Sequence, residues 1–214
     1  MRTRILLLSS ILALAATISS AHAGKAESIG LQANRSGRVA LAPLTDTEKA
    51  DLLFMREEEE LARDVYSNFA EIWSDMVFEN IAKAETKHFN AIGKLLAAYG
   101  LQDSASQEEG QFNNSELQAL YDDLLVRGST SHVDALMIGG LIEEVDIEDL
   151  ANAKAAAAKP AIQRVYDNLL CGSRNHLRAF ARNLEFQGIA YEAQHLSQEE
   201  VDEILDTPMD RCGK

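Results

Sequence analysis

Residues 78–99, FENIAKAETKHFNAIGKLLAAY, decide the fold of this chain. Apolar side chains recur there every three or four positions, which places them on one face of a helix. That face consists of Phe78, Ile81, Glu85, His88, Ile92, Leu95 and Tyr99. Glu85 and His88 therefore interrupt an apolar face one turn apart. Because an isolated carboxylate is costly to bury, we expect Glu85 to be paired or to bind a cation.

Outward from this stretch, five more segments have helical periodicity and helical start and stop signals. The predicted helices cover about 46–72, 76–99, 115–128, 133–156, 160–187 and a short segment opened by Ser197. Thr45 opens a capping box before the first helix. Ser74 or Asp75 caps the second helix, which Gly100 ends.

The lengths of the connections predict how these helices are arranged. The links after the first and third long helices are short, which makes the joined helices antiparallel neighbours, whereas roughly 100–131 form one long crossover. No run of alternating strand residues is present. We therefore expect an all-α fold: a ferritin-like four-helix bundle whose long crossover carries a short helix, followed by a short C-terminal helix.

The other long helices also place polar residues on their apolar faces. Glu59 fills a gap in the apolar face of 46–72, and His176 lies on that of 160–187. On 133–156, Glu143 and Asp146 share a face; we favour Glu143 over Glu144 as the inward glutamate. Taken singly, each has a structural explanation as a rim acid, a buried ion pair or a core histidine. Together they give the oxygen and imidazole ligands that a carboxylate-bridged pair of cations needs.

The composition excludes several classes of partner. The 214 residues carry 34 Asp+Glu against 20 Lys+Arg, a formal net charge of −14. Such a chain has no electrostatic footprint for nucleic acid or for an anionic membrane surface. Two cysteines cannot build a cysteine-based zinc or iron–sulfur site. A cation is the expected partner, although most acids, including Glu57, Glu60 and the cluster at 199–203, are expected on the solvated surface.

The N-terminal residues read as a cleavable signal peptide. Arg2 and Arg4 precede an apolar run from Ile5 to Ile18, and Ala21-His22-Ala23 gives the small-x-small pattern of a cut after Ala23. We expect a secreted or periplasmic protein with no membrane span. The expected organisation is 1–23 signal peptide, 24–44 flexible leader, 45–206 helical bundle and 207–214 C-terminal tail. Export permits a Cys171–Cys212 disulfide, but the spacing does not establish it.

Four segments in order carry a family resemblance. They are Met55-Arg56-Glu57-Glu58-Glu59, Asn80-Ile81-Ala82-x-x-Glu85-x-x-His88, Leu141-Ile142-Glu143-Glu144-x-Asp146-Ile147 and Gly172-Ser173-Arg174-Asn175-His176-Leu177-Arg178-Ala179-Phe180. In addition, Glu59-x-x-Ala62-Arg63-x-x-Tyr66 followed by Glu85-x-x-His88 resembles the first half of a rubrerythrin or ferritin-like di-iron site. The set resembles an uncharacterised ferritin-like domain family of bacteria and archaea, related to the rubrerythrin and ferritin-like di-iron superfamily. The resemblance covers most of 46–206.

The resemblance implies a metal site. The implied ligands are Glu59, Glu85, His88, Glu143 and His176, with Asp146 where rubrerythrins have a second acid; Arg63, Tyr66, Glu144 and Ser173 are candidates to support them. The implied metal is iron, as one or two ions, with manganese as the alternative. Ser173 is a departure, because the pattern has a glutamate three residues before the last histidine, and one bridging carboxylate is thereby missing.

Three functions remain open at this point. The first is a metal-dependent oxidoreductase, ferroxidase- or peroxidase-like, that acts on iron, dioxygen or peroxide. The second is a non-redox module that sequesters metal or is stapled by it. The third is a metal-free structural bundle that binds a partner protein. A homo-oligomer is compatible with each of them.

Overall fold

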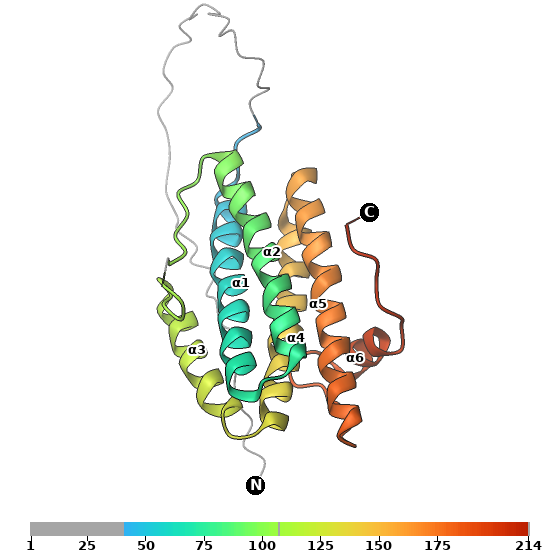
Figure 1. Ribbon diagram of the computed structural model, residues 1–214. Coiled ribbons are helices and arrows are strands. Elements are labelled where there is room, and N and C mark those ends of the chain that lie inside the picture. Colours follow the sequence, from blue (N-terminus) through green and yellow to red (C-terminus); the bar gives the residue numbers. More distant parts are fainter. Residues whose placement is uncertain (1–40, 107, 214) are drawn as a thin grey trace, which may run out of the picture. The chain divides into compact units, whose positions relative to one another are not determined.

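The computed structural model describes residues 41–106 and 108–213, and within them all regular structure is helical, which confirms the all-α prediction. The helices are α1 (Asp46–Trp73), α2 (Met76–Tyr99), α3 (Ser115–Gly128), α4 (His132–Ala156), α5 (Pro160–Phe186) and α6 (Gln198–Leu205) (Figure 1). All six predicted helices are present, with ends that differ from the prediction by about one residue. The predicted signal peptide and most of the leader lie outside the described residues.

Side-chain caps explain where the helices begin. The Thr45 hydroxyl accepts a hydrogen bond from the Glu48 N–H at 3.1 Å, and the Glu48 carboxylate accepts one from the Thr45 N–H at 2.8 Å. This is the predicted capping box of α1. Asp75, rather than Ser74, caps α2 by accepting from the Val77 N–H at 2.9 Å. Ser74 ends α1 instead, in a left-handed conformation with φ of 51°.

The four long helices lie side by side in two contacting pairs. α1 packs on α2 and α5 packs on α4, while α1 also contacts α4 and α2 also contacts α5. Aromatic rings from three of these helices fill part of the interior: Tyr66 and Phe69 from α1, Phe78 from α2 and Phe180 from α5, all fully buried. The ring centroids of Tyr66 and Phe180 are 5.3 Å apart. The candidate site therefore lies among closely packed helices.

Close approach to α4 depends on the two glycines at 139 and 140. A Cβ at Gly139 would lie 2.5 Å from a ring carbon of Phe180, and one at Gly140 would lie 2.4 Å from the ring of Tyr191. No real Cβ atom is found so close to a neighbouring side chain. The loss of helix stability that two glycines bring is thus the cost of tight packing on α4.

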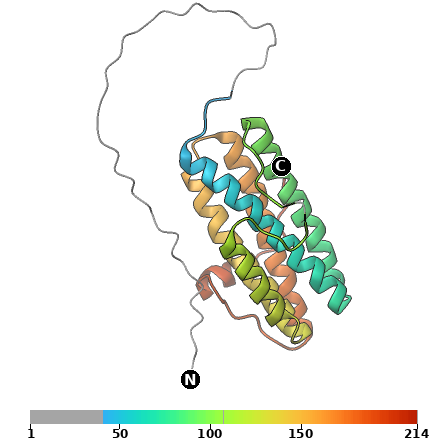
Figure 2. The same ribbon diagram turned by 90° about the vertical axis from the view of Figure 1, so that its left-hand side faces the viewer.

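The crossover covers the outer side of α1. Residues 101–106 and 108–114 pass over this helix before α3 begins (Figure 2). The Asn114 N–H donates to Glu57 Oε2 at 2.8 Å, and Arg56 pairs with Asp103 at 2.8 Å. Glu57 and Glu60 are therefore buried, at 6% and 1% exposure, and the prediction that they are solvated is wrong. The acidic cluster at 199–203 is exposed except for Val201, as predicted for its acids.

The C-terminal segment is fastened to α5. Cys171 and Cys212 form a disulfide with their Cα atoms 5.6 Å apart. The Asn175 side-chain amide donates to the Asp210 carbonyl at 3.0 Å, and Arg178 pairs with the Asp210 carboxylate at 3.2 Å. None of the helices in the described ranges is both long and apolar enough to cross a membrane.

Candidate metal centre

The four long helices bring polar ligand atoms together in their interior. They form two groups of three residues, the His88 group (Glu59, Glu85, His88) and the His176 group (Glu85, Glu143, His176). Within each group, one ligand atom per residue lies within 4.8 Å of the others. The three glutamates are at most 2% exposed. Helices α1, α2, α4 and α5 each contribute at least one residue, so the groups exist only when the helices pack.

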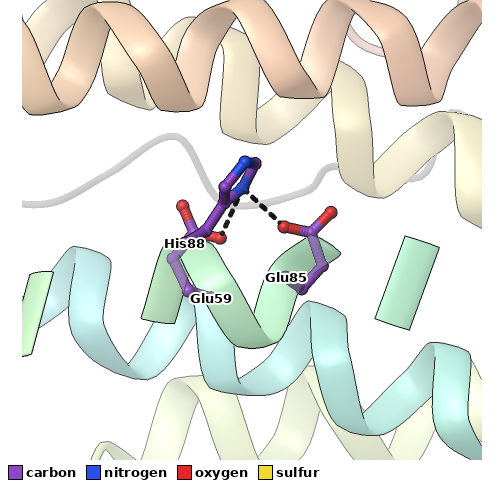
Figure 3. A group of neighbouring side chains, drawn as sticks. All are labelled: Glu59, Glu85 and His88. Carbon is purple, nitrogen blue, oxygen red and sulfur yellow. Dashed lines mark ion pairs between the residues drawn. The ribbon is translucent and has the colours of Figure 1, made fainter. Parts of the chain in front are cut away.

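Glu85 is the residue that the two groups share. Its Oε2 lies 2.7 Å from His88 Nδ1, and its Oε1 lies 2.7 Å from His176 Nδ1. Glu59 Oε2 is 3.3 Å from His88 Nδ1, as Figure 3 shows for the His88 group. Glu143 Oε2 is 3.4 Å from His176 Nδ1. Each histidine thus faces one oxygen of Glu85 and a second glutamate from another helix.

These short contacts are not aligned as hydrogen bonds. His88 Nδ1, His176 Nδ1, Glu59 Oε1 and Glu85 Oε2 are all buried without a hydrogen-bond partner among the described residues. Buried polar atoms are almost always hydrogen-bonded, so four orphaned atoms in one place need an explanation. Atoms that converge without pointing at one another are arranged as ligands are arranged around a cation.

Asp146, which lies on α4, is a fourth buried carboxylate in addition to the three glutamates. It is 6% exposed, its Oδ2 accepts a hydrogen bond from the Ser173 hydroxyl at 2.5 Å, and its Oδ1 has no partner among the described residues. Burial, and then the charges of Glu59, Glu143 and Glu85, raise the pKa of Asp146 well above its ordinary value. Asp146 belongs to neither group of three, but the charges of glutamates from both groups act on it. We call Glu59, Glu85, His88, Glu143, Asp146 and His176 the carboxylate–histidine cluster.

The carboxylates and imidazoles of the cluster shift one another's pKa values. Burial opposes the charged form of Glu85, but His176 and His88 outweigh it and hold its pKa below the ordinary value. Burial raises the pKa of Glu59 to about 7, although His88 opposes the shift. Burial favours neutral imidazoles, yet the neighbouring carboxylates, Glu85 first, raise the pKa of His88, and that of His176 to about 10. The cluster thus balances its negative charge with protons, which divalent cations can displace.

The residues expected to support the ligands divide into two sets. Tyr66 donates its hydroxyl to Glu143 Oε1 at 2.6 Å, and Ser173 binds Asp146. Arg63 is not brought to the cluster, because its guanidinium pairs with Asp64 at 2.7 Å and with Glu60.

Glu144 also lies apart from the cluster. Its carboxylate accepts from the Tyr191 hydroxyl and from the backbone N–H groups of Gln194, His195 and Leu196, the last two at 2.7 Å. It therefore fastens the segment after α5 to α4. Of the two adjacent glutamates on α4, Glu143 is the one that faces the cluster.

Sequence reasoning missed Gly172, which lies against His88. A Cβ at this position would lie 2.6 Å from both Cε1 and Nε2 of the His88 ring. The available signal was an isolated glycine inside a helical pattern, which implies a packing reason. That signal does not say what the glycine packs against, because His88 comes from another helix.

Comparison with known proteins places the cluster in a shared domain. The sequence profile of a family described as "Uncharacterized protein domain (DUF2202)" matches residues 48–208. "Uncharacterized protein MJ0754" of Methanocaldococcus jannaschii is 41% identical over 170 residues, covering 79% of this chain and 92% of that protein. The crystal structure of hypothetical protein MJ0754 from Methanococcus jannaschii matches with a TM-score of 0.78 at 39% identity, over 81% of this chain and 100% of that chain. The range matched by the profile contains the whole cluster.

Proposed function

The chain belongs to the family described as Uncharacterized protein domain (DUF2202), and we propose that its carboxylate–histidine cluster holds two divalent cations inside an exported, ferritin-like four-helix bundle. The observation that carries the proposal is the convergence of orphaned ligand atoms on Glu85, whose two oxygens each face one histidine at 2.7 Å. Glu85 is thereby suited to bridge two cations.

The donor set fits iron or manganese. Carboxylate oxygens combined with imidazole nitrogens suit these first-row cations. The four carboxylates of the cluster balance the four positive charges of two divalent cations when both imidazoles are neutral. Glu59 with His88 would hold one cation, and Glu143 with His176 the other. Glu85 and Asp146 are the carboxylates available to both.

Neighbouring side chains keep the ligands oriented. The Tyr66 hydroxyl holds Oε1 of Glu143, which leaves Oε2 toward His176. The Ser173 hydroxyl holds Oδ2 of Asp146 and leaves Oδ1 free of other partners among the described residues. Such supporting contacts fix ligand geometry and commonly change metal affinity by about 10- to 100-fold. The site thus consists of the ligands themselves and of neighbouring side chains that hold the ligands in position.

The chemistry that this site supports is oxidation by small molecules. Bound iron or manganese would supply electrons to dioxygen or peroxide. The side chains of His88 and His176 are 13% and 11% exposed, whereas the glutamates are at most 2% exposed. The imidazole side is where the cluster comes nearest to solvent, so its reactants must be small. We propose iron(II), dioxygen and peroxide as these reactants.

Two observations support export. The residues before position 24 have the pattern of a cleavable signal peptide. The Cys171–Cys212 disulfide fits an oxidising compartment, because disulfides persist there and are rare in a reducing cytosol. We propose a secreted or periplasmic location on these grounds.

Aerobic iron(II) oxidation tests the proposed activity. Purified protein is mixed with iron(II), and iron(III) formation is followed against a protein-free blank and against Glu85→Ala. We expect wild-type protein to accelerate oxidation and Glu85→Ala to fall to the blank. Glu144→Gln is the control, because this buried carboxylate lies outside the cluster and should keep the wild-type rate. Wild-type protein that binds iron but oxidises it no faster than the blank would instead favour sequestration.

A further inference from the structure

We propose that Gly172 is a positioning residue for His88: the missing side chain on α5 leaves the space that the imidazole occupies in the His88 group. The expected effect on cation binding rests on the proposed function, because it requires that the cluster binds cations. The inference also makes a claim about the cation-free protein, which can be tested separately. It assigns to α5 a role in holding a ligand that belongs to α2.

The contact between the two residues is unusually close. A Cβ at position 172 would lie 2.6 Å from Cε1 and from Nε2 of His88. The same Cβ would lie 3.8 Å from Cε1 of His176, an ordinary van der Waals distance. Gly172 is buried within α5, where glycine lowers helix stability relative to alanine. The glycine therefore accommodates one histidine of the cluster and leaves the other untouched.

A side chain at position 172 would move the His88 ring before it moved the helices apart. The His88 ring is the end of a side chain on two rotatable bonds and is 13% exposed, so it can turn outward. Separating α2 from α5 would instead disrupt the packing between two helices that are in contact and that both carry buried apolar side chains. A methyl group at position 172 therefore displaces Nδ1 of His88 from its place 2.7 Å from Glu85. The fold and the His176 group remain.

This predicts an asymmetric loss of cation binding. Cobalt(II) alone is a suitable probe, because its visible absorption responds to the number and type of its ligands. In Gly172→Ala, one of two cobalt ions should bind roughly 10-fold or more weakly, while the other keeps its wild-type affinity. Gly93→Ala is the matched control: it adds a methyl group inside α2 that would lie 3.0 Å from the guanidinium of Arg56, which pairs with Asp103 outside the cluster. We expect it to bind two ions as wild-type protein does.

A double-mutant cycle separates positioning from a general packing effect. Gly172→Ala, His88→Ala and the double variant are compared with wild-type protein, both for cobalt binding and for the thermal midpoint of the cation-free protein. Positioning predicts that Gly172→Ala changes cobalt binding only when His88 is present. With His88 removed, alanine should raise the midpoint by about 2–4 °C, because it is the better helix former. With His88 present, alanine should lower the midpoint.

The outcomes distinguish this inference from the proposed function. Wild-type cobalt affinity and absorption in Gly172→Ala would overturn the positioning role, and so would an equal loss of binding in both backgrounds. Wild-type protein that binds no cobalt would overturn the proposed function. The thermal midpoints of the cation-free variants would then decide whether Gly172 positions His88. If Gly172→Ala lowers the thermal midpoint when His88 is present and raises it when His88 is replaced by alanine, positioning of His88 is supported. An equal midpoint shift in both would overturn it.

Discussion

The Ser173 hydroxyl donates a hydrogen bond to Asp146 Oδ2 at 2.5 Å, in the buried interface between α5 and α4. The resemblance to di-iron proteins leads one to expect a glutamate at position 173. Here a small hydroxyl stands there, and the carboxylate comes from the facing helix. Asp146 thereby adds a buried carboxylate whose charge interacts with those of Glu59, Glu143 and Glu85, although α5 contributes none.

Ser173→Ala should weaken cation binding without unfolding the protein. Asp146 would lose the donor that fixes its orientation, and loss of such a supporting contact costs about 10- to 100-fold in metal affinity. Equilibrium titration with cobalt(II) or manganese(II) measures the change. Ser173→Thr, which keeps the hydroxyl, is the matched variant and should stay nearer to wild type. Equal affinities for Ser173→Ala and wild-type protein would show that Asp146 needs no positioning by Ser173.

The number of cations lost should depend on which glutamate is removed. Glu85 faces both histidines, so Glu85→Ala should lose both cations. Glu59 belongs only to the His88 group and Glu143 only to the His176 group, so each alanine variant should weaken mainly one cation. Metal analysis after dialysis gives the stoichiometry. Identical losses in all three variants would contradict the division into two groups.

Glu48, a buried carboxylate outside the cluster, should make the free energy of unfolding depend on pH. Burial opposes the charged form of Glu48, but hydrogen bonds from Lys159 and from the N–H groups of Thr45 and Ala158 outweigh it and lower its pKa to about 2. A pKa that is lower in the folded state stabilises the fold above the unfolded pKa of about 4.5. That contribution is lost as the pH falls toward 2.

Glu48→Gln should therefore lower the free energy of unfolding at neutral pH. The difference from wild-type protein should shrink steadily between about pH 5 and pH 2. Denaturant unfolding at a series of pH values measures it. Glu199→Gln, at an exposed position of α6, should show no such trend. A difference for Glu48→Gln that does not change with pH would argue that only its capping role matters.

The disulfide should contribute stability and not cation binding. It closes a loop with a sequence separation of 41 residues, and such a constraint on the unfolded chain is worth roughly 2–4 kcal/mol. We expect Cys171→Ser/Cys212→Ser to unfold at lower denaturant concentration than oxidised wild-type protein. Its cation stoichiometry should be unchanged, because neither cysteine belongs to the cluster. An unchanged unfolding midpoint would show that Arg178 and Asn175 suffice to hold the tail.

Local sequence signals were enough to predict the helices and to pick out the interrupted apolar faces. Thr45, Ser197 and Gly100 act on their own turns of helix, so their roles follow from sequence alone. Glu85 and His88 could be recognised because a charge on an apolar face is costly wherever the helix packs. Both lie at the interior of the packed helices, as the periodicity predicts.

Roles that depend on distant segments could not be read in this way. Glu57 and Glu60 are covered by the crossover, whose path over α1 leaves no local pattern in α1 itself. Glu144 binds the N–H groups of a loop about 50 residues away in sequence. Gly172 matters through a ring carried by another helix. These roles depend on contacts between segments that are far apart in sequence, and only the packed structure shows which segments are in contact.

The most direct test of the central claim is the number of divalent cations that the purified protein binds. Chelator-treated protein is equilibrated anaerobically with iron(II) or manganese(II), and bound metal is measured per chain after gel filtration. Two cations per wild-type chain, and none in Glu85→Ala, is the result that the paired groups predict. Fully folded wild-type protein that retains no cation would contradict it, and the buried cluster would then be an ionic network held together by protons.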